Sequence, residues 1–263
     1  MSKEVKESKE LVAGNFLSVN QKRKHEAKLK YEGKVFPSKN CGDFVVLEFK
    51  DCFNVRVKFL NTGYETIVES ENMKRGVVKD YYAKHTYGVG YLGSNNASAG
   101  YEHLYRKWVS MLNRCYGEHK DKKYYESCYV SEDFLNFTKF RDWALTQKGS
   151  DLKGWVLDKD VLANGSKIYS ETTCCFIPHA INVVFNKRFT QQVDDLGVRS
   201  NGKGYCARIS KFGKYYHLGT FNSREEAVAE YSNAKREYII ELANFHKSNL
   251  DSKVYEKITQ WFN

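Results

Sequence analysis

A segment near the C-terminus carries basic side chains whose chemistry suits a polyanion. Between Gly197 and Asn222 there is no Asp or Glu, and aromatic residues alternate with the cations. The basic residues are Arg199, Lys203, Arg208, Lys211 and Lys214. Guanidinium and ammonium groups bind phosphates, and aromatic side chains add planar contacts. The pattern therefore predicts a nucleic-acid-binding surface, with an ordinary solvated face as the alternative.

Three short β-rich runs and one helix are expected to position this basic set. The runs cover residues 197–200, 205–210 and 215–221, and glycine-bounded turns separate them. Ser223 and Glu226 form a Ser-x-x-Glu capping box, which predicts a helix start. One helical face then carries Ala227, Tyr231, Ala234 and Tyr238. We expect a three-stranded antiparallel sheet with the helix on one face and the cations on the other.

These residues resemble the APETALA2 or ethylene-response-factor type of DNA-binding domain, with its relatives in phage and homing-nuclease proteins. The resemblance covers about a fifth of the chain and rests on Gly197–Arg199, Tyr205–Ile209, Gly213-Lys214, His217–Phe221, Glu226-Ala227, Ala229–Tyr231 and Ala234. It implies that the sheet enters the major groove of double-stranded DNA. Arg208 and Ser210 depart from the plant pattern, so the plant target site is not implied.

Together, the basic set and the resemblance give the expected DNA-binding residues. They are Arg199, Lys203, Tyr205, Arg208, Lys211, Lys214, Tyr216 and His217. The alternative for Tyr205 is a place in the core, where we expect Ile209, Leu218 and Phe221.

The central part of the chain holds a second group of polar residues in a recognisable order. It comprises Trp155–Asp160, Asn164-Gly165, Tyr169–Cys174 and Pro178–Asn182, and a preceding segment bears Trp108, Met111, Leu112, Arg114 and Cys115. This order resembles the HNH nucleases of phages over roughly a third of the chain. The resemblance implies a β-hairpin and helix that hold one divalent cation for phosphodiester hydrolysis.

The HNH resemblance also assigns roles to particular residues. Asp158 matches the metal-binding carboxylate and Asn182 the ligand on the helix, and Asp160 completes the expected ligand set for Mg²⁺ or another divalent cation. The expected catalytic residues are Asp158, Lys159 and His179. Lys159 stands where the general-base histidine belongs, and an ordinary lysine is protonated at neutral pH. His179 could replace it only if its helix turns it inward.

Two functions from different classes therefore stay open. The first is a metal-dependent endonuclease of the homing type, and the second is a catalytically inactive DNA-binding regulator or accessory protein. Lys159 at the expected histidine position supports the second, and Thr173 is a further departure, since it replaces the loop asparagine often found in HNH sites. A third alternative is a phage protein that binds a host protein through its aromatic surface.

The rest of the chain predicts a multidomain α+β protein. The expected parts are a charged arm or helix at 1–30, a small β-barrel or meander at 31–93, a linker at 94–100, an HNH-like ββα-metal domain at 101–190, the APETALA2-like domain at 191–250 and a packing helix at 251–263. Amphipathic helices are expected over 101–115 and 132–147. In the strand at 53–59, Arg56 and Lys58 lie on the polar face, and their contact with DNA stays open.

Composition narrows the partners and the compartment. The formal net charge of +10 favours a polyanion, and no apolar run approaches the length of a membrane span. The first ten residues lack a hydrophobic signal segment. Seven cysteines without a C-x-x-C pair argue against disulfides and a zinc ribbon. We expect a protein of the cytoplasm, the host bacterial cytoplasm if phage-encoded, with duplex DNA as partner; its oligomeric state is undetermined.

Overall fold

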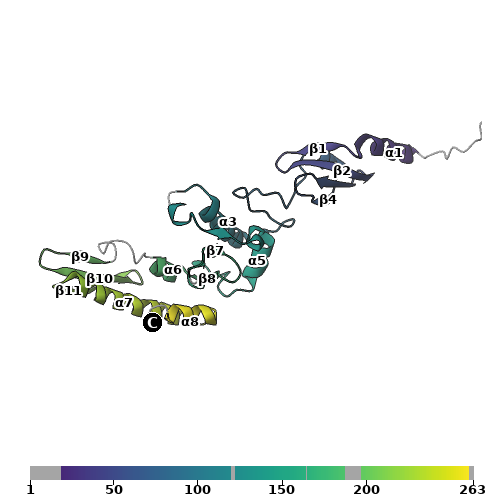
Figure 1. The fold of residues 1–263 in the computed structure, drawn as a ribbon. Helices are drawn as coiled ribbons and strands as arrows, with labels where there is room; N and C mark the ends of the chain where they lie inside the picture. The colour runs from purple at the N-terminus through teal and green to yellow at the C-terminus, as the bar shows by residue number, and fades with distance from the viewer. Residues whose placement is uncertain (1–18, 120–121, 164, 187–196, 261–263) are drawn as a thin grey trace, which may run out of the picture. The chain divides into compact units, whose positions relative to one another are not determined.

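The computed structural model describes residues 19–119, 122–163, 165–186 and 197–260 (Figure 1). The chain divides into two compact units, Met1–Ala83 and Lys84–Asn263. The described residues form a mixed α+β protein with several small sheets and the helices α1 to α8. The N-terminal arm at 1–18 lies outside them, as do Asn164 and residues 187–196.

The first unit is an open antiparallel meander. Its elements are α1 (Val19–Tyr31), β1 (Val35–Ser38), β2 (Gly42–Asp51), β3 (Asn54–Phe59), β4 (Glu65–Val68) and α2 (Ser70–Lys74). The sheet order is β1-β2-β3-β4, and in the described residues it does not close into the barrel that was one expectation. Phe44, Val46, Val55, Val57 and Phe59 are fully buried in its core.

Strand β3 confirms the predicted alternation of apolar and polar residues. Val55 and Val57 are buried, while Arg56 is exposed. The Arg56 guanidinium lies 3.6 Å from a carboxylate oxygen of Glu48 and 3.7 Å from one of Glu65. The Lys58 ammonium lies 3.3 Å from Glu65. The cations on this polar face are therefore paired within their own sheet.

The second unit carries the remaining elements. They are α3 (Glu102–Tyr116), a 3₁₀ turn (Lys122–Tyr124), β5 (Tyr129–Val130), α4 (Glu132–Leu135), α5 (Phe137–Leu145), β6 (Trp155–Asp158), β7 (Ile168–Tyr169), β8 (Cys175–Pro178), α6 (His179–Asn186), β9 (Val198–Ser200), β10 (Tyr205–Lys211), β11 (Lys214–Phe221), α7 (Arg224–Phe245) and α8 (Ser252–Gln260). One hydrophobic cluster includes residues of α3, α5, β6, β8, β10 and α7.

The helix expected over 132–147 is interrupted at Asn136. The side-chain oxygen of Asn136 accepts hydrogen bonds from the backbone N–H groups of Thr138 and Lys139, at 2.9 and 3.4 Å. This is an N-cap, and it starts a new helix, α5, because it satisfies donors that have no partner within the helix. The aromatic stripe predicted the buried face of both helices but not this break.

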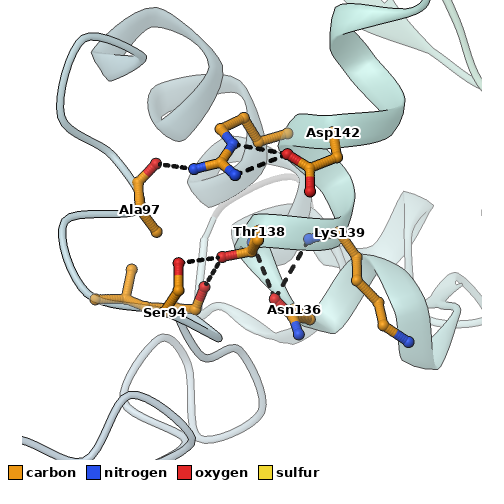
Figure 2. Close-up of polar contacts among 8 residues, drawn as sticks. Ser94, Ala97, Asn136, Thr138, Lys139 and Asp142 are labelled. Atoms are coloured by element: carbon orange, nitrogen blue, oxygen red, sulfur yellow. Dashed lines mark hydrogen bonds and ion pairs between the residues drawn. The ribbon is translucent and has the colours of Figure 1, made fainter.

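The segment 94–100, whose composition suggests a linker, is held against α5. Ser94 Oγ lies 2.9 Å from Thr138 Oγ1, which in turn donates to the Leu92 carbonyl at 2.7 Å (Figure 2). Arg141 donates to the Ala97 carbonyl at 2.9 Å, and Ala97 is buried. Small polar residues therefore serve here as close packing and hydrogen-bonding partners, and the division between the compact units falls earlier, after Ala83.

Candidate nucleic-acid interface

The C-terminal sheet has α7 on one face, as the sequence predicts. Its order is β11-β10-β9, all antiparallel. Val198, Ala207 and Ile209 are buried in the same hydrophobic cluster as Ala227 and Ala234 of α7. Ser223 Oγ accepts a hydrogen bond from the Glu226 N–H at 3.2 Å, so the predicted cap begins the helix. Small alanines on the buried stripe let the helix lie close to the sheet.

The opposite face of the sheet is polar and open to solvent. Residues paired across antiparallel strands share a face, and the pairs here are Arg199 with Cys206, Cys206 with Thr220, Arg208 with His217, and Ser210 with Tyr215. We call these seven residues the outer face. All except the half-buried Cys206 are exposed.

Side-chain contacts order part of the outer face. The Arg208 guanidinium lies 5.7 Å from the centre of the Tyr215 ring, in cation–π range. The Cys206 sulfur lies 3.3 Å from His217 Nδ1. These contacts hold Arg208 and His217 at the centre of the surface and leave the guanidinium edge able to donate.

The cations of the outer face are not neutralised within the described chain. Among residues 19–119, 122–163, 165–186 and 197–260, the carboxylate that pairs with this segment is Glu241, 3.8 Å from the Lys211 ammonium. Lys211 lies on the helix side of the sheet, not on the outer face. The positive charges of Arg199 and Arg208 therefore remain available to a ligand.

The central segment forms a β-hairpin-like pair followed by a helix. Strand β6 pairs antiparallel with β8, and α6 follows β8 directly and contacts both strands. Asp158 ends β6 opposite Cys175 and is 4% exposed. Its Oδ1 accepts a hydrogen bond from the Val161 N–H at 3.0 Å. Burial raises the pKa of this carboxyl from 3.8 to about 6.

Lys159 is a buried cation with a carboxylate partner. Its side chain is 5% exposed, forms an ion pair with the half-exposed Asp160, and lies 5.6 Å from the centre of the Tyr169 ring. Burial acts to lower the pKa of Lys159, but the hydrogen bond and charge of Asp160 outweigh it and raise that pKa. Lys159 thus stays protonated at neutral pH and is unsuited to act as a general base.

The structure does not bring His179 to Asp158. His179 is exposed, and its backbone N–H donates to the Gly154 carbonyl at 2.9 Å. It therefore sits beside the Trp155–Pro178 end of the strand pair, whereas Asp158 sits at the Cys175 end. Three residues of strand separate these ends by about 10 Å. Asn182 is buried one helical turn after His179.

The carboxylates expected to hold a divalent cation have different environments in the described residues. The Asp160 carboxylate is paired with Lys159, and burial raises the pKa of Asp158 to about 6. In the part of the chain that the structure describes, no three His, Cys, Asp or Glu residues come together as a metal site. Burial raises the pKa of the Cys115 and Cys174 thiols to about 12.

No family model matches the chain, and no curated protein or solved structure matches it either. Every helix within the described ranges is too short or too polar to cross a membrane.

The structure divides the eight expected DNA-binding residues by position. Arg199, Arg208 and His217 lie on the outer face, and Lys203 is exposed in the turn between β9 and β10. The other four share the helix side in the register: Tyr205 pairs with Phe221, Tyr216 with Ile209, and Lys211 with Lys214. Tyr205 packs against the core, as the alternative interpretation had it.

Sequence reasoning missed the most prominent aromatic residue of the outer face. Tyr215 is 78% exposed and opposes Ser210 across the strands. Its position two residues before His217 was the available signal, because residues two apart on a strand share a face. A register shift after Ala207 obscures this pattern further along β11.

Proposed function

We propose that this protein binds double-stranded DNA through the outer face of the β9–β11 sheet and reads sequence in the major groove. The observation that carries the proposal is an exposed sheet face with arginines that have no carboxylate partner in the described chain. A β-ribbon fits the roughly 12 Å wide major groove, and Arg binds the O6 and N7 atoms of guanine in a bidentate manner.

The positions of the cations suggest a division of labour. Arg208 lies on the central strand β10 and Arg199 on the neighbouring edge strand β9, both on the outer face, where side chains approach base edges. Lys203 lies in the turn between β9 and β10, where a side chain reaches phosphates beside a groove, and Lys214 adds positive charge next to the turn between β10 and β11. His217 and Ser210 add hydrogen-bonding groups beside Arg208, and Tyr215 adds a planar one.

The test uses the double variant Arg199→Ala/Arg208→Ala and the single variant Lys203→Ala in the full chain. A preferred site is first selected from randomised duplexes, and affinities are then measured by fluorescence anisotropy. The double variant should lose about 1 to 3 kcal/mol per base contact and relax the site preference. Lys203→Ala should weaken binding to all sequences alike. Unchanged affinity and preference in the double variant would contradict the proposal.

A second candidate function is DNA cleavage by the β6–β8–α6 unit. The order of two antiparallel strands followed by a helix, with Asp158 at a strand end, supports it. The protonated Lys159 and the distant His179 weigh against it. The test incubates supercoiled and linear DNA with Mg²⁺ or Mn²⁺ and either the wild type or Asp158→Ala. It distinguishes an endonuclease from a DNA-binding protein without cleavage activity. Cleavage that Asp158→Ala abolishes supports an endonuclease; retained binding without cleavage supports a regulator or accessory protein.

A host protein as the partner is the remaining alternative. Binding to DNA that hardly changes with salt, or no DNA binding at all below about 0.1 M salt, would favour it, because phosphate contacts release counterions and are salt-dependent.

A further inference from the structure

A concave pocket between α3 and β6 has a strongly cationic lining. Its volume is about 180 Å³, and Arg106, Lys107, Ser110 and Arg114 of α3 supply its polar lining, with Met111 and Leu157 among the apolar residues. None of the lining residues is acidic. Arg106, Ser110 and Arg114 are spaced at i, i+4 and i+8, so one helical face presents both guanidinium groups to the pocket.

The three cations of the pocket, Arg106, Lys107 and Arg114, make hydrogen bonds or ring contacts but no close ion pair in the described residues. Lys107 donates to the Ser150 carbonyl at 2.9 Å, and its ammonium lies 4.9 Å from the centre of the Phe176 ring. Arg106 donates through Nε to the Glu102 carbonyl at 3.3 Å and remains exposed. In the described residues, none of these three cations is in an ion pair within 4.0 Å.

Arg114 is the most buried of the three. Its guanidinium is hydrogen-bonded to the Tyr169 side chain. Burial acts to lower the pKa of Arg114, and Tyr169 and Asp158 outweigh that effect. Three acids face this region, which are Glu102 near Arg106, Asp151 near Lys107 and the buried Asp158 near Arg114. In the described residues none of them forms an ion pair within 4.0 Å with these cations, and none lines the pocket.

The geometry points to a second anion site: we propose that this pocket binds a phosphate-type oxyanion, supplied by the backbone of duplex DNA. The pocket volume equals the volume of about six water molecules in the liquid, which is enough for a phosphate group. Two guanidinium forks and an ammonium match its several acceptor oxygens. Attraction is stronger in a half-buried pocket than on an open surface. The choice of DNA as the source rests on the proposed function.

The site lies beside the β6 strand, away from the residues that we assign to base readout. Val156 and Leu157 line it, and Asp158 is the next residue in the chain. A backbone phosphate held here would add affinity without sequence preference. The pocket therefore predicts an effect on salt dependence that differs from the effect of Arg199 or Arg208.

The experiment compares Arg106→Ala and Arg114→Lys with the charge-matched control Lys167→Ala in the full chain. Lys167 is exposed and does not line the pocket. Affinity for duplex DNA is measured over a range of KCl. Arg106→Ala should lower the slope of log K against log salt by roughly 0.9 and weaken binding roughly eightfold at 0.1 M salt, for any sequence. Arg114→Lys keeps the charge and tests the loss of the planar fork. Lys167→Ala should change the slope by much less.

A second arm titrates inorganic phosphate and follows amide chemical shifts of the wild type and Arg106→Ala. A lower salt slope in Arg106→Ala supports the site with DNA as its source. Loss of phosphate-induced shifts without a change in DNA binding supports the oxyanion site and overturns the DNA source. No difference from Lys167→Ala in either arm overturns the inference. If Arg199→Ala/Arg208→Ala still weakens binding in that case, the proposed function stands; if the wild type binds no DNA, the proposed function fails independently.

Discussion

At the scale of residues, Asp158, Lys159 and Asp160 show how far neighbours in sequence can differ in chemistry. Asp158 is buried with a raised pKa, Lys159 is a buried cation, and Asp160 is exposed and pairs with it. The sequence places three charged residues in a row and cannot separate these environments. The sequence shows which residue stands where the HNH resemblance expects a general base, whereas the protonation of Lys159 depends on the environment that the fold creates around it.

The buried Asp158 predicts a pH dependence of stability. Its pKa in the folded protein is raised from 3.8 to about 6. The folded state therefore binds more protons than the unfolded state between about pH 4 and 6, and the free energy of unfolding falls as pH rises through this window. Across this window the free energy of unfolding of the wild type should decrease by about 2 to 3 kcal/mol. Asp158→Asn should abolish this decrease and be more stable than the wild type at pH 7.

Urea unfolding at several pH values measures this difference. Asp151→Asn serves as the control, since Asp151 is exposed. A wild-type profile that matches that of Asp158→Asn across pH 4 to 7 would contradict the burial of an ionisable carboxyl at this position.

At the scale of elements, prediction succeeded where local signals act and failed where partners are distant. The turns predicted the bounds of β9, β10 and β11 to within a few residues, and the capping box predicted the start of α7. Strand β1 was missed because it is only four residues long and contains Pro37, so its place depends on pairing with β2. The break at Asn136 combines a local cap with backbone pairing to Tyr91, and the docking of 94–100 depends on hydrogen bonds to α5. Hydrophobic periodicity does not reveal these polar contacts.

Gly197 is an element-scale test of the sheet. Its φ is +88°, and a Cβ there would lie 2.3 Å from the Arg208 carbonyl oxygen and 2.8 Å from the Tyr231 ring. Gly202 has φ +77° with nothing within 4 Å, so it is a matched control. Gly202→Ala should lower the free energy of unfolding by about 1 kcal/mol, from backbone strain alone. Gly197→Ala should lower it by about 2 kcal/mol more, because the strand or the helix must shift.

Denaturant unfolding of the wild type and of both glycine variants measures these two losses of stability. DNA affinity should fall for Gly197→Ala as well, since Arg208 lies next to the displaced backbone. Equal destabilisation by the two substitutions would mean that the close approach of Gly197 to β10 and α7 does not hold.

At the scale of the whole molecule, the two compact units present cations in different ways. In the first unit, Arg56 and Lys58 pair with Glu48 and Glu65 across the strands. In the second, Arg199 and Arg208 have no such partner in the described chain. A paired cation must lose its carboxylate partner before it binds a phosphate. The loss of that ion pair offsets much of the free energy gained from the phosphate contact. The second unit is therefore the better candidate for DNA binding, although both have exposed basic residues.

This contrast predicts that residues 84–263 alone retain DNA binding. The unit has its own hydrophobic cluster, to which Val254 and Ile258 of α8 contribute. We expect cooperative unfolding of the isolated unit and an affinity for the selected site within about threefold of the full chain, since the difference in binding energy should stay below about 1 kcal/mol. Arg56→Ala/Lys58→Ala in the full chain is the complementary variant and should leave affinity unchanged. A folded 84–263 fragment that binds at least tenfold more weakly, together with a similar loss in the double variant, would instead place part of the interface on the β2–β4 sheet.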